Sequence, residues 1–123
     1  MNRAARSIFV FGLYLTGMGL GLVAMPNTLL GLLRFPASTE IWPRVLGVVT
    51  LVLAYYYIQA ARHELTAFFR WTVTARVGVF VVFAALVLLG LAPATLVLLG
   101  AVDLAAAIWT GLALRSATKS AIA

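Results

Sequence analysis

Four long apolar stretches alternate with short polar ones along this chain. They cover about residues 8–25, 41–61, 71–91 and 95–114, and none of them contains more than one charged residue. A helix of about 20 apolar residues is long enough to cross the hydrocarbon core of a bilayer. The pattern therefore predicts four membrane-spanning helices, which make residues 1–123 a single integral membrane domain.

A fifth apolar segment, much shorter, lies between the first two spans. Pro26 and Asn27 are expected to end the first helix, and Thr28–Phe35 follows them. Eight residues of helix rise only about 12 Å, which is far too short to cross a bilayer. We expect an interfacial helix here, closed by Pro36. The predicted fold is an all-α, four-helix transmembrane bundle with a short interfacial helix between helices 1 and 2.

The composition supports a membrane protein. Hydrophobic residues make up 64% of the chain and charged residues 10%, and the mean hydropathy is +1.10. A soluble domain of this size needs more polar surface to cover itself. The net charge of +6 is typical of nucleic-acid binding in soluble proteins, but here the basic residues flank the apolar spans. We expect the lipid bilayer, and no nucleic acid, as a partner.

The basic residues are distributed unevenly between the two sides of the predicted bundle. Four spans place both termini on one side, which collects seven of the nine Lys and Arg residues: Arg3, Arg6, Arg62, Arg70, Arg76, Arg115 and Lys119. Arg34 and Arg44 lie on the other side. The positive-inside rule then predicts cytoplasmic termini, in a multi-pass protein of a bacterial inner (plasma) membrane. A signal peptide is the competing interpretation of the N-terminus, but the apolar run is long and an uncleaved helix fits it better.

Asp103 stands out because it is a carboxylate near the middle of the fourth span. A charge at that depth costs about 2.5–3.5 kcal/mol on insertion scales. One interpretation is a structural lock, in which the buried carboxylate pairs with Arg44 or Arg76. It would also accept a hydrogen bond from the hydroxyl of Tyr55 or Tyr57. The other is a site for a proton or a cationic ligand. The tyrosines could instead belong to an aromatic belt at the membrane interface.

Small residues mark the faces on which we expect helices to pack closely. Gly17 and Gly21 form a GxxxG pair in the first span, and Gly100, Ala107 and Gly111 recur along the fourth. Such spacing lets the backbone of another helix approach, although glycine is common in membrane helices generally. A homo-oligomer or a membrane-protein partner would be compatible with these faces.

The chain offers little reactive chemistry. It has no cysteine, and His63 is its single histidine, so we expect no disulfide, no metal site and no haem with two histidine ligands from one chain. Asp103 has no second acid in any span, and neither a serine-histidine-acid cluster nor a glycine-rich phosphate loop is present. We therefore expect no catalytic residues and no cofactor.

Four short patterns resemble a loose group of uncharacterised small bacterial four-helix membrane proteins. They are Pro26-Asn27 followed by Leu-Leu-Gly-Leu-Leu, Trp42-x-Arg44-Val-Leu-Gly, Tyr56-Tyr57 followed by Ala60-Ala61-Arg62, and Asp103-Leu-Ala-Ala-Ala-x-Trp109-Thr. The resemblance implies the architecture and no activity. Small multidrug transporters have a similar length and helix number, but their essential glutamate lies in the first helix, where Ile8–Met25 has no acid.

These observations favour a non-enzymatic membrane protein that binds lipid or a protein partner. The alternative is a transporter of a small or hydrophobic solute, with Asp103 as the proton or cation site. A lipid-modifying enzyme is the least favoured class. A polar cavity that reaches Asp103 would favour the transporter, whereas a dry, packed interior would favour the binding protein.

Overall fold

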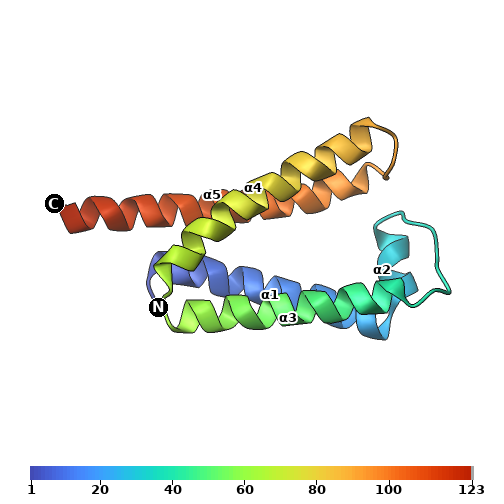
Figure 1. Ribbon diagram of the computed structural model, residues 1–123, viewed down its shortest axis with the longest axis horizontal. Coiled ribbons are helices and arrows are strands. Elements are labelled where there is room, and N and C mark those ends of the chain that lie inside the picture. The colour runs from blue at the N-terminus through green and yellow to red at the C-terminus, as the bar shows by residue number, and fades with distance from the viewer. Residues whose placement is uncertain (123) are drawn as a thin grey trace.

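The computed structural model describes residues 1–122, with side chains for residues 1–116, and within them the chain forms five helices and no strand. They are α1 (Arg3–Ala24), α2 (Pro26–Leu32), α3 (Trp42–Arg62), α4 (Thr66–Leu88) and α5 (Thr95–Ile122) (Figure 1). All except α2 are long and apolar enough to cross a membrane. The predicted all-α, four-helix fold with a short helix after the first span is thereby confirmed. Lys119 lies outside the described side chains.

Local signals set most helix ends. The side chain of Asn2 caps α1 by accepting a hydrogen bond of 2.7 Å from the backbone N–H of Ala5. α2 begins at Pro26, two residues earlier than expected, because proline suits the first helical position and needs no N–H there. α4 begins at Thr66, although we expected the span from about residue 71. The polar residues there leave the membrane without breaking the helix, since neither Gly nor Pro interrupts them.

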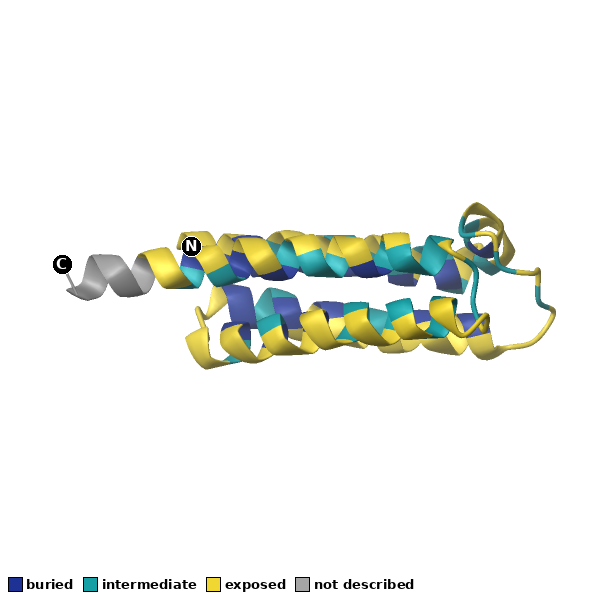
Figure 2. Ribbon diagram, turned by 90° about the horizontal axis from the view of Figure 1, so that it is seen from above, coloured by how far each residue is buried: buried dark blue, intermediate teal, exposed yellow. Residues whose placement is uncertain are grey.

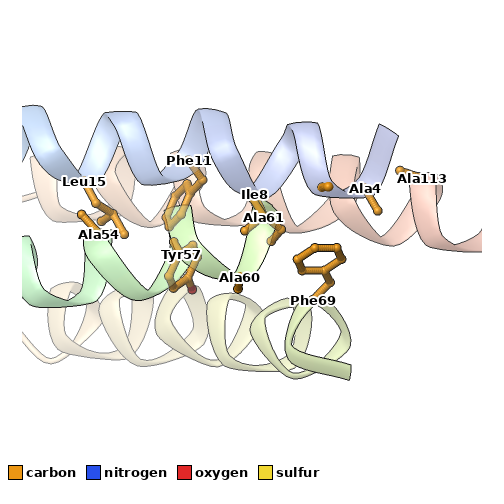
Figure 3. Close-up of a cluster of buried hydrophobic side chains, with 11 residues drawn as sticks. Ala4, Ile8, Phe11, Leu15, Ala54, Tyr57, Ala60, Ala61, Phe69 and Ala113 are labelled. Carbon is orange, nitrogen blue, oxygen red and sulfur yellow. The ribbon is translucent and has the colours of Figure 1, made fainter. Parts of the chain in front are cut away.

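The four long helices form two antiparallel hairpins, α1 with α3 and α4 with α5, and α1 also packs against α5 (Figure 1). The buried core gathers at the end that holds the N-terminus and the α3–α4 turn (Figure 3). We call this the arginine-rich end, because it carries Arg3, Arg6, Arg62, Arg70 and Arg115. At the other end, the α2 end, the hydroxyl of Thr95 donates a hydrogen bond to the carbonyl of Leu33, which joins α5 to the segment after α2.

Exposed residues run along the outer faces of the long helices (Figure 2). Many of them are large apolar side chains, where a soluble protein would be polar. Among them are Leu20, Val49, Val81, Leu98 and Ile108, one or more from each long helix. This exposed apolar surface is what four spans in contact with lipid require.

Glycines let α1 and α3 touch, but they are not the predicted pair. Gly19 faces Gly47, and a Cβ added to Gly19 would lie 3.0 Å from the carbonyl oxygen of Gly47. Gly17 has nothing within 4 Å of such a Cβ, and Gly21 meets Leu29 of α2 instead of a spanning helix. Successive residues turn by about 100° around a helix, so Gly17 and Gly19 point to different sides. Within this chain, the close packing expected at Gly17 therefore falls on Gly19.

The small residues of α5 face α4 to different degrees. A Cβ on Gly100 would lie 3.2 Å from a ring carbon of Phe80, which is a tight approach. Ala107 is fully buried. Gly111 packs more loosely, since its nearest neighbour would be Val73 at 3.9 Å.

Candidate functional site

An apolar cleft lies between the two hairpins toward the α2 end. It has two adjoining parts, with volumes of about 210 and 160 Å³, and five residues line both of them: Met18, Leu22, Leu46, Phe83 and Leu99. The larger part also contacts Leu30, Leu33 and Phe35, so that α2 and the segment after it form its roof. The smaller part lies farther from the α2 end, beside the middle of α1, α3 and α5, and we call it the deep part.

Asp103 lies in the deeper part of the cleft. It lines that part together with Tyr14 and Thr50, and it is the one charged residue among the lining side chains of either part. Among the described residues, no group donates a hydrogen bond to its carboxylate and no cation lies within ion-pair distance. The expected pairing with Arg44 or Arg76 is therefore wrong for this structure, and so is the tyrosine hydroxyl as a second partner.

Arg44 acts at the end of another helix. Its Nη1 donates a hydrogen bond of 2.7 Å to the carbonyl oxygen of Val23, in the last turn of α1. The last four carbonyls of a helix have no partner within it, so a neighbouring arginine can satisfy one of them. Arg44 lies near the α2 end and holds α3 against α1. It does not contact Asp103.

Arg76 is buried, with 3% of its surface exposed, and hydroxyl groups hold it. Its Nε donates to the carbonyl oxygen of Thr72 at 3.2 Å, and its Nη2 donates to the hydroxyls of Thr72 and Thr110, each at 3.0 Å. The Thr110 hydroxyl also shares a hydrogen bond of 2.6 Å with the hydroxyl of Ser7. The guanidinium carbon lies 4.9 Å from the ring centre of Phe11. This network joins α1, α4 and α5.

One atom of Arg76 lacks a partner. Its Nη1 is buried and forms no hydrogen bond in the described part of the chain. The guanidinium is nevertheless near enough to Asp103 to interact with it through space. The two residues miss direct contact because helical side chains lean toward the N-terminus of their own helix. Since α4 and α5 run antiparallel, Arg76 leans toward Thr72 and the arginine-rich end, whereas Asp103 leans toward Leu99 and the cleft.

The three consecutive tyrosines of α3 divide between inside and outside. Tyr57 is buried, with its ring 5.4 Å from that of Phe11 and 5.3 Å from that of Phe68. It lies near enough to Arg76 and Asp103 for electrostatic interaction. Tyr55 is 59% exposed and its ring meets that of Tyr56 edge to face, so it takes no part in the site.

Tyr14 and Thr50 are site residues that the sequence did not single out, and Tyr14 is the more informative. It lines the deep part of the cleft beside Asp103, and it repeats with Met18 and Leu22 at steps of four residues along α1. This spacing could have identified Tyr14 from the sequence. It places the tyrosine hydroxyl at one end of an apolar stripe that packs against another helix. Of the five residues predicted for the site, the structure brings Asp103, Arg76 and Tyr57 together and places Arg44 and Tyr55 elsewhere.

The arrangement suits the binding of an amphiphile. The apolar walls accept a hydrocarbon chain, and Asp103 accepts hydrogen bonds or a positive charge at the deep end. Thr50 and Tyr14 add hydroxyl groups beside it. No group of three or more His, Asp and Glu side chains that could hold a metal is found among the described residues. No family model, curated protein or solved structure matches this chain.

Proposed function

We propose that this protein is a non-enzymatic, multi-pass membrane protein that binds a hydrophobic amine in the cleft between its hairpins. The ammonium group of the ligand lies at Asp103, and its alkyl chain extends past Leu22, Leu46 and Leu99 toward the α2 end. The observation that carries the proposal is a carboxylate at the deep end of an apolar cleft that has no hydrogen bond or ion pair within the described residues.

The head group decides the selectivity of such a site. A ligand that arrives from the bilayer already has its chain in an apolar medium, so moving the chain into the cleft changes its solvation little. A cation at Asp103, by contrast, gains a charge pair in a region of low dielectric constant. An anionic amphiphile of the same length would meet the repulsion of the carboxylate. Amines should therefore bind more tightly than alcohols, and alcohols more tightly than fatty acids.

Photolabelling in nanodiscs tests the proposal. The probe is a long-chain primary amine with a diazirine in its tail, and the competitors are an alkylamine, an alcohol and a fatty acid of equal length. We expect labelled peptides from α1, α3 and α5, and competition in the order amine, alcohol, fatty acid. Asp103→Asn should weaken probe binding at least about tenfold, because a hydrogen bond to a charged group contributes about 1.5–3 kcal/mol.

A matched pair of variants controls for the cleft itself. Leu99→Phe adds bulk inside it, whereas Leu98→Phe adds the same bulk on the outer surface, where Leu98 is 66% exposed. The first variant should reduce labelling and the second should not. Equal labelling of the Asp103→Asn protein, or equal competition by amine and fatty acid, would refute the amine site.

Transport of the amine is the second candidate function. It is favoured by the position of Asp103 near the middle of its span and by the uneven packing of the hairpins, which share a core at the arginine-rich end and leave a cleft toward the α2 end. Rocking of one hairpin against the other would open and close such a cleft. Flux of a labelled amine into proteoliposomes distinguishes the two functions, since a binding protein shows saturable binding without flux.

We propose a bacterial inner membrane as the location, with both termini in the cytoplasm, and membership in the small four-helix group that the motifs resemble. The support is the excess of arginines at the arginine-rich end. A reporter that is active only in the cytoplasm should be active when it is fused to either terminus. A silent fusion at one terminus, in a protein that still inserts, would overturn this orientation.

A further inference from the structure

Two further grooves adjoin each other on α5 at the arginine-rich end, and neither shares a lining residue with the cleft. The first has a volume of about 170 Å³ and is lined by Arg3, Trp109, Leu112, Ala113 and Ser116. The second has a volume of about 320 Å³, lies along α4 and α5, and is lined by Val73, Val77, Ala107, Ile108, Gly111, Leu112 and Arg115. Leu112 belongs to both and forms the ridge between them.

The charged and polar residues of both grooves lie at the same end. Arg3 and Ser116 belong to the first groove and Arg115 to the second, and the remaining walls are mainly apolar. Both arginines are exposed, and neither has a hydrogen bond or ion pair within the described chain. Glu64, in the turn between α3 and α4 at this end, accepts a hydrogen bond of 3.0 Å from the backbone N–H of Asn2. Among the described residues, the two arginines therefore have no direct counter-ion, and the nearby Glu64 carboxylate is hydrogen-bonded to the backbone of Asn2.

This combination matches a two-chain lipid with an acidic head. Arginine binds phosphate oxygens through paired N–H groups, and basic pockets between helices at the cytoplasmic side bind anionic head groups. The half-exposed Trp109 supplies an amphipathic ring of the kind found at the membrane interface.

We propose that these paired grooves bind one anionic phospholipid, with its phosphate between Arg3 and Arg115 and an acyl chain on each side of Leu112. This site is independent of the amine cleft, because it uses other residues at the opposite end of the bundle. Charge complementarity selects the occupant: a zwitterionic lipid would fit the grooves equally well but would leave the two arginines unneutralised.

Native mass spectrometry of protein released from nanodiscs tests the proposal. The nanodiscs contain phosphatidylcholine and phosphatidylglycerol in equal amounts, and the retained lipid is identified by mass. We expect the wild-type protein to retain one phosphatidylglycerol molecule preferentially. The double variant Arg3→Gln/Arg115→Gln should lower that preference about tenfold, since each arginine near an anionic lipid surface contributes substantially to binding. An unchanged preference in this variant would overturn the proposal.

Two controls separate the site from general attraction between charges. Arg6→Gln/Arg62→Gln removes the same charge from exposed positions at the same end that line neither groove, and it should leave the preference intact. Gly111→Leu fills the second groove without a change of charge and should reduce retention, whereas Gly78→Leu, on an open surface of α4, should not. An equal loss in both double variants, or equal retention in both glycine variants, would contradict a built lipid site. Glycerol phosphate should not displace the lipid; displacement would mean that the arginines bind a free phosphate head.

Discussion

The contact between Gly19 and Gly47 allows a sharp test of how α1 and α3 pack. In the Gly19→Ala variant, the new Cβ would lie 2.7 Å from Cγ of Leu51 and 3.0 Å from the carbonyl oxygen of Gly47. The leucine side chain can rotate away, but the carbonyl belongs to the backbone, so the two helices must separate. Such overpacking costs about 1–3 kcal/mol, and the better helix propensity of alanine returns up to about 1 kcal/mol. We expect a net loss of roughly 1–2 kcal/mol in the free energy of unfolding.

Gly17→Ala is the matched control, because it makes the same substitution two residues away on the same helix. Nothing lies within 4 Å of its added Cβ, so the variant should be as stable as the wild type or slightly more stable. Reversible unfolding in mixed micelles, followed by circular dichroism as the fraction of dodecyl sulfate rises, measures both. The packing would be refuted if Gly19→Ala unfolded no earlier than Gly17→Ala. A loss confined to Gly17→Ala would indicate that the other face of α1 makes the close contact.

Two further predictions concern polar groups that hold the helices together. Thr110→Val keeps the shape of the side chain but removes the hydroxyl that accepts a hydrogen bond from the buried Arg76 guanidinium. The same unfolding titration should show a loss of about 0.6–1.7 kcal/mol in the free energy of unfolding, which is the range for hydrogen bonds between membrane helices. Thr74→Val, at an exposed position of α4, should stay within about 0.5 kcal/mol of the wild type, and equal losses would remove the special role of the network. Arg44→Met should leave the carbonyl of Val23 without its partner and speed hydrogen exchange in the last turn of α1, whereas Arg34→Met should not; unchanged exchange in the Arg44 variant would contradict the capping role.

The architecture was predictable because it depends on local information. The length of each apolar run and the position of Pro26 suffice to place four spans and one short helix. The start of α4 at Thr66 was not predictable in the same way. Hydropathy marks where a helix enters the membrane, and a helix can continue through polar residues into water as long as its backbone hydrogen bonds continue.

The site was predictable only in part because it depends on how helices face one another. Asp103 and Arg76 attract attention as charges inside apolar spans, and both do lie in the interior. Which tyrosine joins them depends on rotation: Tyr55 and Tyr57 differ by about 200° around α3, and the sequence does not show which side meets α1. The hydrogen bond between Arg76 and the Thr110 hydroxyl depends on the register of α4 against α5. That register cannot be read from the sequence of either helix alone.

The hydrogen-bonded lock that the sequence offered as one interpretation of Asp103 is formed around Arg76 instead. α4 is joined to α5 by the hydrogen bond from Arg76 to the Thr110 hydroxyl, and α5 is joined to α1 by the hydrogen bond between the hydroxyls of Thr110 and Ser7. Two hydroxyls and one backbone carbonyl accept hydrogen bonds from Nη2 and Nε of the guanidinium, so Arg76 is held in place without Asp103. A direct Arg76–Asp103 pair would have turned the carboxylate away from the cleft and sealed its deep end. The opposite lean of the two side chains instead keeps the carboxylate oxygens open toward the cleft. An acid held in this way can accept a cation from the cleft without any rearrangement of the network that holds the helices together.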